Sequence, residues 1–187
     1  LVTRDLDLLR EFARWNGIMV AVTITTLDPD LRRLMEPRTS SPAMRLRIIE
    51  ELSAAGIPTI VMVAPVIPGL TEHEIPKIIE SASDAGASGA GYIMLRLPYG
   101  VSDIFVAWLG RHYPDRKEKV LNRIMSVRDG KLNSAEFHDR MQGRGVYAEQ
   151  VKNLFDMAKR KAGFARGVTE LSTKEFRRPD GKQLNLL

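Results

Sequence analysis

The chain has 187 residues, of which 44% are hydrophobic and 27% are charged, and this ordinary balance excludes a disordered chain, a collagen and a disulfide scaffold. Cysteine is absent, which removes disulfides, thiolate metal sites and cysteine nucleophiles from this chain and fits a cytoplasmic location. No run of about 18 apolar residues occurs, so a membrane partner is not expected.

The net charge of +5 is distributed unevenly. Residues 1–110 contain 10 basic and 13 acidic side chains, whereas residues 111–187 contain 18 and 10. This asymmetry predicts that the C-terminal part contacts an anionic partner such as a nucleic acid. Because Glu and Asp are interleaved with the basic residues, a solvated helical surface remains an alternative.

Helix and strand patterns alternate three times over the first hundred residues. Leu8, Leu9 and Phe12 recur at helical spacing, and Ser41 followed by Pro42 starts a second helix. Apolar runs follow each helix and predict buried strands. The predicted helices cover residues 5–15, 42–55 and 71–85, and the predicted strands cover residues 18–24, 59–64 and 90–96.

This alternation predicts a parallel α/β sheet or barrel with both faces covered. Three strands with two open edges make a poor isolated domain, so we expect residues 1–100 to be the C-terminal half of a larger barrel. Residues 101–176 are predicted to form a basic helical extension, and residues 177–187 a tail. The helices of the extension are predicted over residues 104–113, 114–127, 134–141 and 147–162.

The strongest local motif runs from Pro65 to Glu72, between a buried strand and a helix. Parallel α/β folds build their sites from loops at this end of the strands. Gly69 permits a tight backbone path, and Ile67 can face a flat ligand. The alternative is a plain connection in which Thr71 and Glu74 form a capping box, and both interpretations can hold together.

A second group of candidates lies at the ends of the other two strands. Thr23 and Thr25 place hydroxyls at the carboxyl edge of the sheet, and Glu36 could accept hydrogen bonds from ribose hydroxyls. Arg38 could pair with a carboxylate, although an internal contact between Glu36 and Arg38 is the alternative. Arg96 ends an apolar strand, where a charge points into a site or reaches the rim.

Other site classes find little support. The spacing of the three histidines does not suit a metal site, and neither a Ser-His-Asp arrangement nor a phosphate-binding glycine loop is visible. Three aromatic residues among basic ones could stack on bases, but packing between helices is favoured: Trp108, Tyr113 and Tyr147. No residue is assigned a catalytic role.

Five separate stretches, spread over nearly the whole chain, carry a resemblance to a known family: residues 1–9, 34–42, 55–58, 63–70 and 181–187. In their sequence and order they resemble the radical S-adenosylmethionine (SAM) superfamily and, within it, the spore photoproduct lyase-like or "DNA repair photolyase" branch. The resemblance implies a partial (β/α)₆ barrel of the TIM type that binds SAM and a 4Fe-4S cluster.

The resemblance also assigns site residues. The Gly-x-Ile-x-Gly-x-x-Glu pattern of the superfamily helps to hold adenine, and here Pro65 replaces its first glycine whereas Ile67, Gly69 and Glu72 match. Adenine contacts are therefore implied near Ile67. Ribose or methionyl contacts are implied, less securely, for Thr23, Thr25, Glu36 and Arg38, and the strand that ends at Arg96 would lie beside the cofactor.

The cluster ligands are where this chain departs from the superfamily. The superfamily holds its cluster with a Cys-x₃-Cys-x₂-Cys motif, and this chain has no cysteine. The resemblance therefore implies an upstream cluster loop outside this chain and a parent enzyme of lyase-like type. That parent would cleave SAM to a 5′-deoxyadenosyl radical and abstract hydrogen from a substrate, which could be a nucleic acid. The chain by itself is expected to be inactive.

Two other functions compete with the radical enzyme. One is an α/β module that binds nucleic acid without catalysis, through residues 111–187. The other is a complete α/β enzyme or scaffold, which three central strands make a poor prediction.

Overall fold

A parallel sheet organises the computed structural model, which describes residues 2–134, 136, 139–164 and 170–175. Within these residues the strand order is β1 (Val20–Thr23), β2 (Thr59–Val66) and β3 (Gly89–Met94), with β2 paired in parallel to both neighbours. The chain passes from β1 to β2 through α2 (Pro29–Met35) and α3 (Pro42–Ala54), and from β2 to β3 through α4 (Ile75–Asp84). The α/β class predicted from the alternation of helices and strands is confirmed. The partial (β/α)₆ barrel is not, because the described residues contain three strands.

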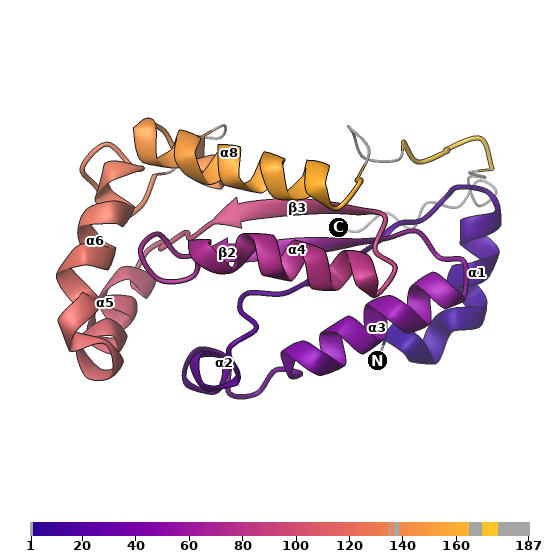
Figure 1. Ribbon diagram of the computed structural model, residues 1–187, viewed down its shortest axis with the longest axis horizontal. Coiled ribbons are helices and arrows are strands. Elements are labelled where there is room, and N and C mark those ends of the chain that lie inside the picture. Colours follow the sequence, from indigo (N-terminus) through magenta and orange to yellow (C-terminus); the bar gives the residue numbers. More distant parts are fainter. Residues whose placement is uncertain (1, 135, 137–138, 165–169, 176–187) are drawn as a thin grey trace, which may run out of the picture.

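The remaining elements surround this sheet. They are η1 (Val2–Asp5), α1 (Leu6–Arg14), η2 (Glu72–Glu74), α5 (Val101–His112), η3 (Pro114–Arg116), α6 (Lys117–Ser126), α7 (Asp139–Gln142) and α8 (Val146–Lys161). Figure 1 shows α3, α4 and α8 along the sheet, with α5 and α6 beyond the end to which the strand arrows point. The predicted tail over residues 177–187 and part of the predicted helix over residues 134–141 lie outside the described residues.

The helices cover one face of the sheet. Val22, Val61 and Val63 point into the core beneath them and are almost fully buried. Ala21 and Thr23 point to the opposite face and are exposed. The prediction that both faces of the sheet are covered is therefore wrong for the described chain. An apolar run shows that a strand can be buried, but it does not show that a helix covers each of its faces.

Two apolar clusters form the core. The first lies between the sheet and its helices and includes Ile49, Leu52 and Phe155 of α8. The second lies at the carboxyl end of the sheet, where Ile67 packs with Leu109 and other side chains of α2, α5 and α6. Because α8 belongs to the first cluster, the predicted division at residue 100 does not coincide with a break in the core.

Local signals explain where the helices begin. The Ser41 hydroxyl accepts a hydrogen bond from the Met44 amide (3.2 Å), which confirms the predicted start of α3. Helix α2 was not predicted, because seven residues hold too few turns for a periodic pattern. Asp28 before Pro29 was nevertheless a readable signal, since the Asp28 carboxylate accepts from the Asp30 and Leu31 amides (2.8 and 3.2 Å).

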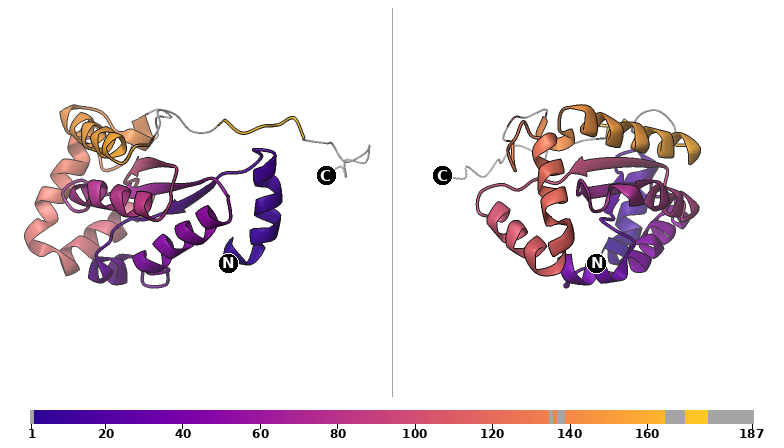
Figure 2. Two further views of the ribbon diagram at one scale, coloured as in Figure 1. Left: turned by 45° about the vertical axis from the view of Figure 1, so that its right-hand side comes forward. Right: turned by 60° about the vertical axis from the view of Figure 1, so that its left-hand side comes forward.

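Helix α1 packs through a different face from the predicted one. Leu6, Leu9 and Ala13 lie against the core, whereas Leu8 and Phe12 are 55% and 50% exposed. Near the other end of the chain, the short segment 170–175 passes the end of α1 (Figure 2). There the Ser172 amide donates to the carbonyl of Asn16 (2.9 Å). No helix in the described residues is long and apolar enough to cross a membrane.

Candidate functional site

An open cavity of about 380 Å³ lies at the carboxyl end of the sheet and gathers three of the predicted site residues. Thr23 ends β1, Glu36 follows α2 and Arg96 follows β3, so residues far apart in sequence meet because parallel strands end at one edge. The cavity is lined by Thr23, Glu36, Ala64, Pro65, Ile93, Met94, Leu95 and Arg96.

Glu36 is held in place from two sides. The Thr25 hydroxyl donates to Glu36 Oε1 (2.9 Å) and lies 2.8 Å from the carbonyl oxygen of Ala64. Arg45 Nη2 donates to Glu36 Oε2 (2.8 Å), and Arg45 Nη1 donates to the Thr23 carbonyl (2.7 Å). The ion pair is largely covered, with the side chains of Arg45 and Glu36 14% and 23% exposed.

Arg45, and not Arg38, is the cation that pairs with Glu36, whereas the ligand contact predicted for Arg38 stays a prediction. The alternative of an internal contact between Glu36 and Arg38 is wrong, because Glu36 pairs with Arg45 while Arg38 is exposed. A signal for Arg45 existed. Helices between parallel strands run back against them, so the first turn of α3 lies at the carboxyl edge where sites form.

Arg96, which lines the cavity, has an unused hydrogen-bond donor. Its side chain is half-buried, and its Nε is buried without a hydrogen-bond partner among the described residues. A buried donor without an acceptor is unfavourable, and a ligand that supplies an acceptor relieves this penalty. The cavity therefore suits a ligand that carries an anionic or carbonyl oxygen.

Pro65 lines the cavity, and after it the loop up to Glu72 turns toward α6. Ile67 is 0% exposed in the second cluster, so in this conformation its side chain offers no surface to a ligand, and its adenine contact stays a prediction. Gly69 has φ +84°, and a Cβ there would lie 3.2 Å from Arg123 Cδ. Glycine is thus required by the backbone and by the close approach of α6.

The predicted capping box is wrong, because both of its residues bind elsewhere. The Thr71 hydroxyl accepts from the Ile67 amide (2.9 Å) and closes the loop upon itself. The Glu74 carboxylate accepts from the Thr26 hydroxyl (2.6 Å) and the Leu27 amide (2.7 Å). Glu74 thereby ties the loop after β1 to the loop after β2, a long-range contact that spacing along the chain does not reveal.

Glu72 lies apart from the cavity residues and contacts the helices that follow β3. Its Oε1 accepts from Arg123 Nη1 of α6 (3.0 Å) and from the Tyr147 hydroxyl of α8 (2.5 Å). Burial raises the pKa of Tyr147 to about 12, with the hydrogen bond to Glu72 as the next cause. Arg123 was missed in the sequence, and Tyr147 was considered only for stacking or packing.

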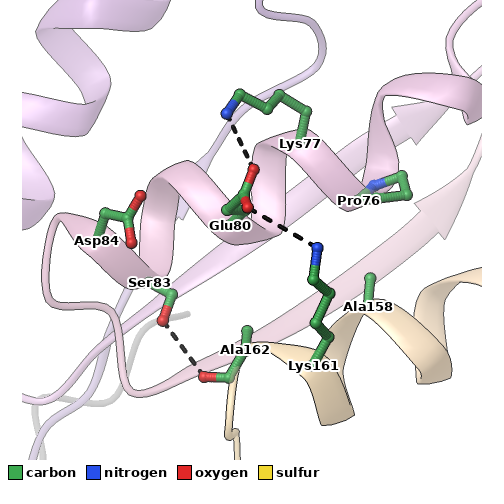
Figure 3. Close-up of a pocket in the computed structure, with 8 residues that line it drawn as sticks. All are labelled: Pro76, Lys77, Glu80, Ser83, Asp84, Ala158, Lys161 and Ala162. Carbon is green, nitrogen blue, oxygen red and sulfur yellow. Dashed lines mark hydrogen bonds and ion pairs between the residues drawn. The ribbon is translucent and has the colours of Figure 1, made fainter.

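A groove of about 440 Å³ between α4 and α8 contains none of the predicted site residues (Figure 3). Lys77 Nζ bonds Glu80 Oε2 (2.9 Å), and Lys161 Nζ lies 4.0 Å from Glu80 Oε1. Lys77, Glu80 and Lys161 therefore pair with one another, so these three side chains offer no unpaired charge to a ligand. No cluster of three or more possible metal-binding side chains occurs in the part of the chain that the structure describes.

Residues 1–82 of the chain match the model of the Radical SAM superfamily. The match runs from α1 to within α4 and includes Thr23, Glu36 and the loop up to Glu72, whereas Arg96 and the helices after β3 lie beyond it. Proteins of this superfamily in general use SAM and a 4Fe-4S cluster, and the match extends to no narrower branch.

Several uncharacterized proteins are similar to part of the chain. Rv2578c of Mycobacterium tuberculosis is 37% identical over 117 residues, which are 62% of this chain and 34% of that protein. ORF301 of Acidianus two-tailed virus is 37% identical over 91 residues, 46% of this chain and 30% of that protein. MJ0683 of Methanocaldococcus jannaschii is 32% identical over 74 residues, which are 40% of this chain and 27% of that protein. The chain spans about a third of the length of its first such relatives. No solved structure matches it.

Proposed function

We propose that the cavity at the carboxyl end of the sheet holds SAM in a radical SAM enzyme. The observation that carries the proposal is the buried, unpartnered Nε of Arg96 beside Thr23 and Glu36, next to a segment that matches the superfamily. SAM bound beside a 4Fe-4S cluster supplies such enzymes with a 5′-deoxyadenosyl radical, which abstracts hydrogen from the substrate.

The cavity residues fit the polar part of SAM. Arg96 can donate to the carboxylate of the methionyl group, which is the acceptor that its Nε lacks. Glu36 receives hydrogen bonds from Thr25, Arg45 and Thr39. A carboxylate has about four acceptor positions, so one remains for a ribose hydroxyl. In the same proposal the backbone of the loop from Pro65 to Glu72 contacts the adenine.

The residues do not fit the cluster itself. Iron–sulfur clusters are held by cysteine thiolates, and the chain has none. Ligands of the cluster must therefore come from outside these 187 residues. We propose that the chain by itself binds SAM without cleaving it.

Calorimetric titration of the 187-residue chain with SAM tests the cavity. We expect Arg96→Gln to weaken binding about tenfold or more, because a hydrogen bond to a charged group is lost. Arg47→Gln is the matched control, since Arg47 is an exposed arginine whose ion pair with Glu51 lies on the surface. The proposal fails if the unchanged chain binds no SAM, or if both variants bind equally well.

The class of enzyme is tested on the protein expressed from its complete gene without oxygen. After reconstitution with iron and sulfide, we expect a reducible 4Fe-4S signal in the electron-spin spectrum that changes when SAM is added. A protein that assembles no cluster would overturn the assignment and direct attention to the helices after β3.

We propose further that the substrate is a nucleic acid and that the reaction is lyase-like, as in the spore photoproduct lyase-like branch. Support comes from the separate stretches that resemble this branch and from the basic C-terminal part of the chain. Exposed basic residues of α5, α6, α8 and η3 would contact the phosphates: Arg111, Arg116, Lys119, Lys152, Arg160 and Lys161.

The aromatic residues do not add to this proposal. Trp108 Nε1 donates to the Leu34 carbonyl (3.1 Å), and the Trp108 ring lies 5.5 Å from that of Tyr113, so packing accounts for both. Binding of single- and double-stranded DNA at several salt concentrations is the test. A steep fall in affinity with salt supports phosphate contacts, and no binding at low salt would remove nucleic acid from the proposal.

A further inference from the structure

Two side chains from the segment after β3 converge on Glu72. Arg123 lies on α6, 51 residues further along the chain, and Tyr147 lies in the first turn of α8, 75 residues further along. Both donate to Glu72 Oε1. Glu72 is the first residue of η2, directly after the loop that follows β2, so these contacts link the end of that loop to two helices remote in sequence.

The three side chains also contact one another. Arg123 Nη1 donates to the Tyr147 hydroxyl as well as to Glu72, and the Arg123 guanidinium carbon lies 4.6 Å from the centre of the Tyr147 ring. The side chain of Glu72 is 16% exposed and that of Arg123 is 37% exposed, so water screens their ion pair only in part. A covered, charge-assisted network of this kind restricts the rotamers of all three residues.

Helix α6 also packs closely against the middle of the loop, at Gly69. A Cβ at Gly69 would lie 3.2 Å from Arg123 Cδ and 3.4 Å from Val120 Cα. Inside the loop, the Leu70 and Thr71 amides donate to the Ile67 carbonyl (2.9 and 3.0 Å). Internal hydrogen bonds therefore close the loop, whereas α6 and α8 hold its outer side.

We propose that Arg123 and Tyr147 are positioning residues, which act through Glu72 to set the loop from Pro65 to Glu72 against its ligand. The inference rests on the proposed function, in which the backbone of this loop contacts adenine. It adds that the helices after β3 control the adenine end of the site, although they lie outside the segment that matches the superfamily. Glu72 Oε2, buried without a partner in the described chain, can accept from a donor when the loop adjusts.

The variants Tyr147→Phe and Arg123→Gln allow the opening of the loop and the affinity for ligands to be measured separately. Hydrogen exchange reports the loop amides, and calorimetry reports the binding of adenosine and of methionine to the full 187-residue chain. We expect loop exchange to rise, and adenosine affinity to fall, each by about tenfold, with methionine affinity unchanged. Arg123→Lys keeps the charge and should restore part of the adenosine affinity.

Tyr92→Phe is the matched control, because the Tyr92 hydroxyl is also buried but has no partner among the described residues. It should change neither loop exchange nor adenosine binding. A merely structural role for Tyr147 would lower both affinities together. In Arg96→Gln the pattern should be reversed, with methionine binding weakened and adenosine binding kept.

Three results would overturn the inference. Unchanged loop exchange in both variants would show that the contacts do not hold the loop. Faster exchange with unchanged adenosine affinity would show that the loop does not position the ligand. If the unchanged chain binds neither adenosine nor SAM, the proposed function fails as well, and the exchange data still show whether Arg123 and Tyr147 hold the loop.

Discussion

At the residue scale, the two candidate carboxylates share one construction. Glu36 binds a threonine hydroxyl and Arg45, and Glu72 binds a tyrosine hydroxyl and Arg123. Each carboxylate is thus engaged by one cationic donor and at least one hydroxyl, because Glu36 also accepts from a second threonine hydroxyl. These charge-assisted contacts hold backbone segments in place, and each carboxylate still keeps acceptor capacity, one position on Glu36 and the buried Oε2 of Glu72. Arg96 differs from both carboxylates, because its buried Nε has no hydrogen-bond partner in the described structure.

Gly69→Ala should destabilise the fold by about 1–3 kcal/mol, because alanine is strained at φ +84° and its Cβ would press against Arg123. Gly56→Ala distinguishes backbone strain from the close approach of Arg123. Gly56 has a similar φ of +74° but open space around its Cβ position. We expect urea unfolding to show a larger loss for Gly69→Ala than for Gly56→Ala. Equal losses would mean that the close approach of α6 adds nothing.

Tyr92 should make stability fall at alkaline pH. Burial raises its pKa to about 12, with the charge of Asp156 as the second cause, whereas an unfolded tyrosine titrates near pH ~10. The folded state therefore keeps a proton that the unfolded state loses between these values, and its stability contribution, complete below pH ~10, declines up to pH ~12.

The comparison with Tyr92→Phe isolates this effect. At pH 8 the variant should be as stable as the unchanged protein or slightly more stable, because the hydroxyl it removes has no partner in the described structure. Above pH ~10, urea unfolding should show the unchanged protein losing stability faster than the variant. Parallel stability curves would contradict the assignment.

At the element scale, helix α2 shows how a short helix delivers a site residue. Asp28 caps its start, Leu31 anchors it in the second cluster, and Glu36 lies at its end beside the cavity. The position of Glu36 thus depends on a helix of seven residues, which has little stability of its own. The contacts of Glu36 with Thr25 and Arg45 therefore fix its position, which α2 is too short to do by itself.

Asp28→Ala should lower the free energy of unfolding by about 1 kcal/mol, because two amides at the start of α2 lose their acceptor. Asp30→Ala is the control from the same turn: Asp30 makes only an exposed ion pair with Arg33 in the described structure, and its loss should stay within about 0.5 kcal/mol. Thermal unfolding of the two variants checks this difference, and similar melting temperatures would count against the cap.

At the scale of the whole molecule, α8 packs the C-terminal part of the described chain onto the sheet and α4. Its apolar face covers β3 and α4, and the Phe155 ring lies 4.7 Å from that of Tyr92. Figure 1 shows α8 running the length of the sheet. The sheet therefore depends on a helix that lies 46 or more residues after the predicted division at residue 100.

Phe155→Ala should cost about 3–5 kcal/mol and lower the stability of the sheet and helices together, because it opens a cavity in their shared core. Met157→Ala on the exposed side of the same helix should cost within about 0.5 kcal/mol. Hydrogen exchange distinguishes the strands from α8. If the strands keep their protection while α8 loses its own, the two parts are independent units.

Local chemistry in the sequence determined the class of fold, most of the helices and the edge of the sheet where a site would form. Apolar periodicity and capping residues act over a few positions, so they can be read along the chain. The threonines, Glu36 and Arg96 followed from the same logic, because strand ends point to one edge.

Only the tertiary structure decided which partners these residues have. Glu36 pairs with Arg45 and not with Arg38, and Glu74 contacts the loop after β1 instead of capping a helix. Arg123 and Tyr147 contact Glu72 from helices remote in sequence. It also decided that one face of the sheet is open and that α1 turns Leu8 and Phe12 outward. The physical reason is that hydrogen bonds and packing between distant segments depend on how helices and strands meet in space. The spacing of residues along the chain does not encode the distance between two such segments.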